Sequence, residues 1–337
     1  MKRKGFVFIP IILIVFCIVT LCSMYIVYLT KLEACMTFSL SDKIQSNYHS
    51  ETKINRILYD EYYRDTYLEP FIINHLVNPM TAPRSLSIKL KDEDIDDKDT
   101  LNKVNVTIYN NDNNRKEISI DTESNYNGIR TSLHKKARVV NDIFEVGKLP
   151  IVSYDLCEDL SGKLSLFYNE LKDGLILDKI PSKYKIIHTF DHDKISIRSK
   201  DSTDNTIKKT RNIAIELEDY NKKTYKDTIF IIENKLYTPL TLEIEESTYK
   251  DPLVLNGIIY LEGDLIISGR FKFNGIIILK GKASKIIVNS EIEPVIRGMI
   301  LTEGNTDYLD KVDIMYNSDY IYKYGIYLPG FFELNTR

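Results

Sequence analysis

The longest hydrophobic run in the sequence lies at its N-terminus. From Phe6 to Leu29 the chain has 24 consecutive residues without a charge, and Pro10, near the start, is the only proline among them. A helix of this length spans about 36 Å, which exceeds the roughly 30 Å of a bilayer's hydrocarbon core. The pattern therefore predicts a transmembrane helix over residues 6–30, preceded by a basic leader over residues 1–5.

The charges beside this run predict its orientation. Lys2, Arg3 and Lys4 precede it, and every acidic residue follows it. Basic residues next to a transmembrane helix stay on the cytoplasmic side. We therefore expect a single-pass protein of the cell membrane, with the lipid bilayer as a partner, a cytoplasmic N-terminus and an extracytoplasmic bulk.

A cleaved secretion signal is the alternative interpretation of the run. Its apolar stretch is normally about 7 to 15 residues long and is followed by small residues at the cut. Here Lys31 and Glu33 occupy that region. The segment from Leu32 to Cys35 loosely matches a lipoprotein box, but the charged Glu33 fits that motif poorly. The sequence favours an uncleaved anchor.

Apolar residues continue at every fourth position after the run, as on one face of a helix. No glycine interrupts the chain between Gly5 and Gly128. We predict a helical stalk over residues 31–80, with this stripe packed on its own domain. Ser39, Ser41 and Asp42 are possible caps of a second helix, so a break stays open. The stripe consists of Leu32, Met36, Leu40, Ile44 and Tyr48, followed by Ile54, Leu58 and Tyr62.

From about Ser85 the period changes to two, which is typical of half-buried strands. Val104, Val106 and Ile108 alternate with polar residues, and after a turn the alternation resumes, which predicts a hairpin. A helix is expected over residues 160–171. We predict an antiparallel β-rich domain over residues 81–250, because parallel strands normally need helical crossovers that are missing here. Further strands are expected at residues 185–189, 195–198, 212–218, 228–233 and 241–245.

The last third of the chain contains glycines at intervals of six. Within each complete interval the second and fourth residues are apolar, so an inward face is locked to the glycine positions. This pattern predicts a short β-solenoid over residues 251–310, with glycines at the corners and about 18 residues per coil. An antiparallel meander with tight glycine turns is the alternative. The predicted corners are Gly257, Gly263, Gly269, Gly275 and Gly281, then Gly298 and Gly304.

Residues 311–337 form a tyrosine-rich tail. Six tyrosines lie in the last 30 residues, and Pro329 to Phe332 follow them. Such rings either provide a binding surface or cover the open end of the solenoid. We favour a cap, because an uncovered sheet edge promotes aggregation. The tyrosines are Tyr308, Tyr316, Tyr320, Tyr322, Tyr324 and Tyr327.

Composition narrows the class of protein. Of 337 residues 43% are hydrophobic, which is ordinary for a folded chain, and the fold class expected is α+β. Without the leader, 42 basic residues stand against 48 acidic ones, which argues against nucleic acid as a partner. Cys35 and Cys157 are the only cysteines outside the apolar run, so the chain is not a disulfide scaffold, and whether they pair stays open.

Motifs for catalysis and cofactors are weak. The segment Gly275 to Lys282 has the wrong spacing for a phosphate loop, so no nucleotide is expected. His188, Asp191, His192 and Asp193 offer metal-ligating atoms, but the segment is expected to be a strand end and a solvated loop. The acidic segment 92–99 lacks the spacing of a calcium loop and is expected to be a solvated linker. We predict no enzyme activity, no metal and no cofactor.

The N-terminus and the glycine pattern together resemble minor pilins of type IV pili and pseudopilins of type II secretion-like systems. The matching residues are the leader Met1 to Gly5 and Phe6, which opens the apolar helix. The resemblance implies that a prepilin peptidase cuts after Gly5, so that Phe6 starts the mature chain. Shaft subunits of the family usually have a glutamate at the fifth mature position, where this chain has Pro10. That departure implies a low-copy component rather than a bulk shaft subunit.

Two hypotheses of function follow. The first is a non-enzymatic minor pilin-like protein whose membrane helix packs with those of other pilin subunits, while a β-rich head lies outside. The second is a single-pass, membrane-anchored module that binds envelope glycan or protein. Cleavage of the leader distinguishes the two.

Overall fold

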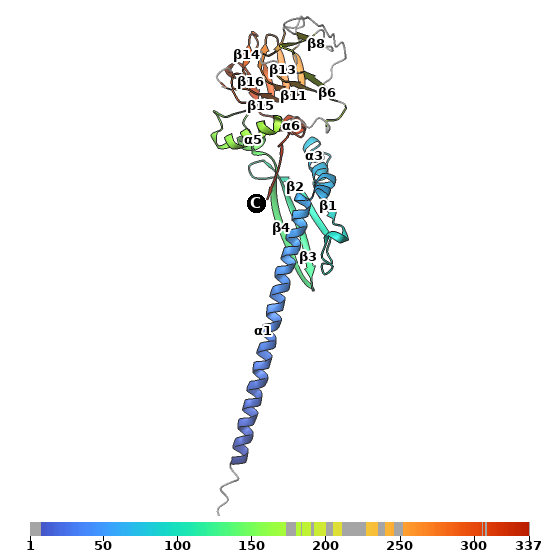
Figure 1. The fold of residues 1–337 in the computed structure, drawn as a ribbon, viewed down its shortest axis with the longest axis vertical. Coiled ribbons are helices and arrows are strands. Elements are labelled where there is room, and N and C mark those ends of the chain that lie inside the picture. The colour runs from blue at the N-terminus through green and yellow to red at the C-terminus, as the bar shows by residue number, and fades with distance from the viewer. Residues whose placement is uncertain are drawn as a thin grey trace, which may run out of the picture.

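A computed structural model of the chain shows an elongated molecule (Figure 1). A long helix projects from one end, an antiparallel sheet packs on its upper part, and two parallel sheets form the opposite end. The structure describes residues 8–172, 180–182, 184–189, 192–199, 205–210, 227–234, 240–245, 252–304, 306 and 309–336.

Helix α1 (Phe8–Tyr59) is one continuous helix of 52 residues. Pro10 lies in its first turn, where a missing backbone N–H costs little. The predicted second start near Ser39 does not occur. Among the described residues α1 is the one helix long and apolar enough to cross a membrane, and the apolar window that qualifies it is 0% buried in the protein.

The predicted packing of the stalk stripe is wrong for its first half. Met36 and Leu40 are 63% and 60% exposed, and Leu32, Ile44 and Tyr48 are also exposed. The helix contacts its own sheet only in its upper part, so the four-residue period continues beyond the body that covers it. The residues of α1 that are buried are Ser46, Ser50, Lys53, Ile54, Ile57 and Leu58.

Two short helices follow α1 and lead into the antiparallel sheet. Its strand order is β1-β2-β3-β4-β17, and the predicted hairpin of β2 and β3 is confirmed by the pairing of Val106 with Ile120. Alternate side chains of β2 and β3 are buried in a core shared with α1. The bounds are α2 (Glu61–Tyr63), α3 (Glu69–Val77), β1 (Ser85–Lys89), β2 (Lys103–Asn110), β3 (Lys116–Tyr126), β4 (Ile129–Val140) and β17 (Phe332–Thr336).

A helical layer lies between the antiparallel sheet and the parallel sheets (Figure 1). It includes α4 (Asp142–Glu145) and α5 (Ser161–Lys172), and α5 confirms the helix predicted there. The short strand β5 (Ile151–Ser153) leaves this layer and pairs with the parallel sheets.

The strands between residues 185 and 315 form two parallel sheets, called here the parallel-sheet unit. Consecutive strands mostly alternate between the sheets, and β8 is the one described strand that pairs antiparallel there. The first sheet contains β6 (Lys185–Thr189), β9 (Asp227–Ile232), β11 (Leu253–Leu261), β13 (Phe271–Leu279), β15 (Val295–Thr302) and β16 (Asp313–Met315). The second contains β7 (Lys194–Ser199), β8 (Asn205–Thr210), β10 (Thr241–Ile244), β12 (Asp264–Ile267) and β14 (Ile286–Val288).

The antiparallel arrangement predicted for residues 185–245 is therefore wrong. β9 pairs parallel with both β6 and β11, and β10 pairs parallel with both β7 and β12. No helical crossover is needed, because the chain returns through the other sheet. The pairing of β9 with β11 also crosses the predicted domain boundary at residue 250. The strand expected at 212–218 lies outside the described residues.

The repeat length predicted from the glycines is confirmed. Leu253 pairs with Phe271 and Leu261 with Leu279, an offset of 18 residues along the whole length of β11. All eight predicted inward residues belong to the core between the two sheets, together with Phe230 and Leu242 from earlier strands. The eight are Ile259, Leu261, Leu265, Ile267, Phe271, Phe273, Ile277 and Leu279.

The predicted corner glycines fall into two groups. Gly263, Gly269, Gly281 and Gly304 lie in connections between strands. The other three lie in the middle of strands, where Gly275 pairs with both its counterparts. A Cβ on Gly275 would lie 1.9 Å from the carbonyl oxygen of the neighbouring glycine, and the φ of 151° also disfavours other residues. The mid-strand glycines are Gly257, Gly275 and Gly298.

The tail does more than the predicted cap. β16 pairs with the edge strand β15, and β5 pairs with the other half of that same edge. Helix α6 (Ser318–Gly325), however, packs across the face of β11, β13 and β15, and the chain then returns to pair β17 with β4. The tail thus links the parallel-sheet unit to the antiparallel sheet.

Replacement of the mid-strand glycine tests the parallel stacking. Gly275→Ala is expected to destabilise the protein by about 3 kcal/mol or more, because the neighbouring atoms are backbone and cannot move aside. Gly162→Ala in α5 is the matched control, since an added Cβ there meets nothing within 4 Å. Thermal unfolding of the detergent-solubilised chain measures both. Equal midpoints for the two variants would contradict the described register.

Candidate functional site

The apolar surface of α1 is the first candidate functional feature. Residues 8–29 give about 33 Å of helix, enough to span a hydrocarbon core. Tyr25 and Tyr28 lie near the upper end of this segment, one turn before Lys31. Tyrosines and lysines are enriched where transmembrane helices meet the lipid headgroups. The segment therefore has the length and the boundary residues of a membrane span.

Between this segment and the sheet, about 24 Å of helix carries an uncovered apolar face. Leu32, Met36 and Leu40, with Cys35, Ser39 and Lys43, line a shallow groove along the helix. By helical spacing the groove continues the face that Ser46, Ser50 and Ile54 bury against the sheet. One face of α1 is thus shared by an internal interface above and an open surface below.

A buried ion pair fixes α1 to the antiparallel sheet. Lys53 Nζ lies 2.6 Å from Asp99 Oδ2, and the side chains are 3% and 0% exposed. The ammonium also donates to the carbonyl oxygens of Leu101 and Glu123, while Asp99 Oδ1 accepts from the backbone N–H of Asn125. Burial acts to raise the pKa of Asp99, but the bonds from Lys53 and the backbone hold this pKa below its ordinary value. The pair is charged and fully solvated by protein groups.

The acidic segment 92–99 is consequently not the solvated linker that was expected. Besides Asp99, the carboxylate of Asp94 accepts from Arg56 Nη1 at 2.6 Å and from Tyr63 Oη at 2.5 Å. Both partners come from the end of α1 and the helix after it. Spacing alone could not show this, because the carboxylates pair with residues that lie about 40 positions earlier.

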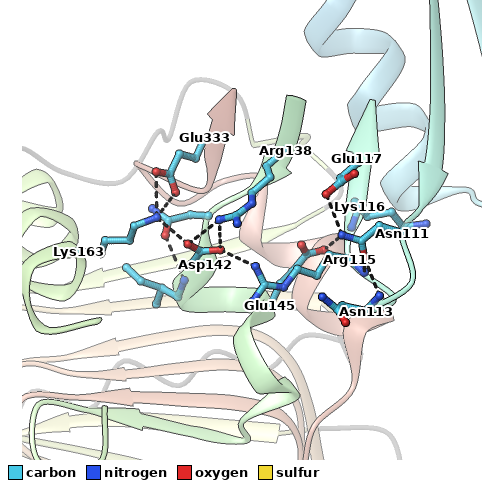
Figure 2. Close-up of polar contacts among 12 residues, drawn as sticks. Asn111, Asn113, Arg115, Lys116, Glu117, Arg138, Asp142, Glu145, Lys163 and Glu333 are labelled. Carbon is cyan, nitrogen blue, oxygen red and sulfur yellow. Dashed lines mark hydrogen bonds and ion pairs between the residues drawn. The ribbon is translucent and has the colours of Figure 1, made fainter. Parts of the chain in front are cut away.

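A polar cluster joins the helical layer to the sheet and the tail (Figure 2). Asp142 of α4 accepts from Arg115 Nη1 at 3.0 Å, from Arg138 Nη1 at 2.9 Å and from Lys163 Nζ at 2.8 Å. Lys163 also pairs with Glu333 of β17 at 2.9 Å. Burial acts to raise the pKa of Asp142, but Lys163 and the two arginines keep this pKa below its ordinary value. The carboxylate therefore holds four segments together.

The tail tyrosines act as internal contacts. Tyr322 Oη donates to Glu145 at 2.6 Å, Tyr316 Oη to the Phe144 carbonyl at 2.8 Å, and Tyr324 Oη to Asp227 at 2.5 Å. Tyr322, Tyr324 and Tyr327 are buried. Rings in these positions are not exposed for a ligand, so the binding-surface interpretation of the tail is wrong for them. Tyr308 lies outside the described residues.

The other predicted residues do not assemble into a site. Lys2, Arg3, Lys4, Gly5 and Phe6 lie outside the described residues. Both Cys35, which is exposed, and Cys157, which is buried, are free thiols.

The histidine segment holds two side chains in local contacts. His188 Nε2 lies 3.5 Å from Glu233 Oε2, and His192 Nδ1 lies 2.6 Å from Thr189 Oγ1, whereas Asp191 lies outside the described residues. Where the structure describes the chain, no three histidine, cysteine or acidic side chains are grouped to hold a metal.

One polar trio on the outer face of the sheet escaped the sequence analysis. His134 Nδ1 lies 2.6 Å from Asp121 Oδ1 and 3.3 Å from Ser119 Oγ. The three residues pair across β3 and β4, and only the strand register brings them together. A nucleophilic serine needs the imidazole nitrogen opposite the one that the carboxylate holds. Here both groups contact Nδ1, so the trio lacks the geometry of a catalytic triad.

No family model, curated protein or solved structure matches the chain.

Neutralisation of the polar cluster tests its importance. Asp142→Asn keeps the shape but removes the charge that three cations share, with an expected cost of about 2 kcal/mol at neutral pH. Because the folded pKa of Asp142 is lowered, its contribution is present above the ordinary aspartate pKa and is lost as the pH falls through the folded value. The variant should therefore lose less stability on acidification than the wild type in thermal scans. Asp65→Asn, at a half-exposed ion pair, is the control and should change stability by less than about 0.5 kcal/mol.

Proposed function

We propose that the chain is a non-enzymatic, minor pilin-like component of a type IV pilus or type II secretion-like assembly. The observation that carries the proposal is the form of α1. Its lower part offers unburied apolar surface of membrane length, and its upper part is built into a β-rich body by the Lys53–Asp99 pair. A continuous helix of this kind holds a head at a fixed position relative to the bilayer.

In this proposal the leader stays cytoplasmic and the body lies outside the membrane. Lys2, Arg3 and Lys4 hold the N-terminus inside, a prepilin peptidase cuts after Gly5, and Phe6 becomes the first residue. The helix then packs through van der Waals contacts with the helices of other subunits. Pro10 replaces the usual glutamate, which fits a low-copy position in the assembly.

The parallel-sheet unit is proposed to be a short β-solenoid that serves as the distal part of the head. Support comes from the offset of 18 residues between β11 and β13 and from the core enclosed by the two sheets. Both faces of its first sheet are buried, because Ile258 and Ile276 pack with the helical layer. Such a unit rests on the stalk sheet instead of standing alone, since short repeat arrays need caps.

The N-terminus of the native protein tests this proposal. Mass spectrometry of the chain purified from its own cells should show a protein that begins at Phe6, because the leader is removed at Gly5. A Gly5→Val variant should keep the leader, whereas Gly128→Ala, far from the cut, should be processed normally. A wild-type chain that still begins at Met1 would contradict the pilin route and leave the membrane-anchored binding module as the better hypothesis.

A further inference from the structure

The C-terminal tail is the clasp between the two β-rich parts of the molecule. Its strand β17 belongs to the antiparallel sheet, and its helix α6 packs on the first sheet of the parallel-sheet unit. Asn141 Nδ2 donates to the carbonyl oxygen of Gly330, which adds a third attachment. If α6 detached, the two parts would lose much of their shared core.

A buried carboxylate lies at this clasp. The Glu145 residue is 6% exposed, and its Oε1 accepts from Tyr322 Oη at 2.6 Å and from the backbone N–H of Lys116 at 3.1 Å. Within the described part of the chain no cation forms an ion pair with Glu145. This distinguishes it from Asp99 and Asp142, whose charges are directly paired.

The surroundings of Glu145 form a small cavity of about 130 Å³ between α3, the β2–β3 hairpin, α4 and the tail. Charged and titratable groups face it from three of these segments. The hairpin contributes Arg115 and Lys116, the chain just after α4 contributes Lys148, and the tail contributes Tyr316, Asp319 and Tyr322. Leu76 and Pro79, from α3 and the turn after it, are apolar or uncharged. No cation in this set lies within ion-pair distance of the carboxylate, although Arg115 and Lys116 act on it from further away.

We propose that Glu145 makes the clasp sensitive to pH: the protonated side chain holds α6 in place, and the unpaired buried carboxylate weakens this attachment. A protonated carboxyl keeps an acceptor oxygen for Tyr322 and loses the cost of burying a charge. The ionised form keeps both hydrogen bonds but bears that cost. The inference does not depend on the proposed membrane assembly.

The direction of the effect follows from the burial. Burial raises the pKa of Glu145, and this outweighs the lowering by Tyr322 and the Lys116 N–H. Burial also lowers the pKa of Lys116, so the nearby ammonium is itself disfavoured. Because the folded pKa is raised, the stabilisation is fully present below the ordinary glutamate pKa and is lost as the pH rises through the folded value.

Hydrogen exchange measured by mass spectrometry tests the clasp in the full chain held in detergent micelles. After correction for intrinsic rates, the protection of α6 amides should fall as the pH rises from about 5 to about 8, by at most about tenfold per pH unit, the limit for one proton. Glu145→Gln should keep the protection nearly constant and should be the better protected protein at the higher pH. Tyr322→Phe removes a donor to the carboxylate and should make the wild-type loss steeper.

Glu117→Gln is the matched control. Glu117 is equally buried and accepts from Tyr109 Oη, but it lies on the sheet and not at the clasp. This variant should follow the wild-type pH profile of α6. The proposal is overturned if Glu145→Gln and the wild type share one pH profile. It is also overturned if the glutamine variant is less protected than the wild type at every pH, because the carboxylate would then be the form that holds α6.

Discussion

Everything in this structure is arranged around an apolar helix surface that the protein itself does not cover. Side chains of α1 such as Phe8, Phe16 and Met24 are 69%, 69% and 68% exposed. In water, a surface of this size is unfavourable by roughly 25 cal/mol per Å² of apolar area. A lipid bilayer removes that cost, and the helix has the length to cross one. The distance of the head from the membrane and the direction of the stalk both follow from this requirement.

Above the apolar surface, buried charges join the parts into one body. Lys53 with Asp99 fixes the helix to the sheet, and Asp142 with its three cations joins the sheet, the helical layer and the tail. Removal of one partner from such a pair leaves an uncompensated charge, which is why these contacts specify a geometry more than they add stability. Glu145 is the exception, because it is buried at the clasp without a paired cation.

Local periodicity predicted the parts of the fold that depend on near neighbours. The apolar run gave α1, the alternation around Val106 gave the hairpin, and the six-residue glycine interval gave the 18-residue coil. In each case the residues that pair or pack lie close in sequence. The inward side chains of the glycine region were predictable for the same reason, since strand period and repeat length agree.

The features that sequence missed depend on distant partners. The direction of β9 and β10 is set by strands on either side of them, and alternation is the same for parallel and antiparallel pairs. Mid-strand glycines such as Gly275 meet a neighbouring backbone, which spacing alone assigns to a corner. The stalk residue Met36 keeps its helical period although no sheet covers it. Candidate-site geometry around Asp142 combines four segments and was not visible in any one of them.

The chain's own cysteines allow a direct test of the central claim that a bilayer covers the lower part of α1. Spheroplasts are treated with a membrane-impermeant maleimide, first intact, then after the bilayer is dissolved in mild detergent, and finally after denaturation. The account predicts that Cys35 reacts in intact spheroplasts, that Cys17 and Cys22 react only once the bilayer is dissolved, and that the buried Cys157 reacts only on unfolding. Reaction of Cys17 and Cys22 while the bilayer is intact, or of Cys35 only after lysis, would contradict it.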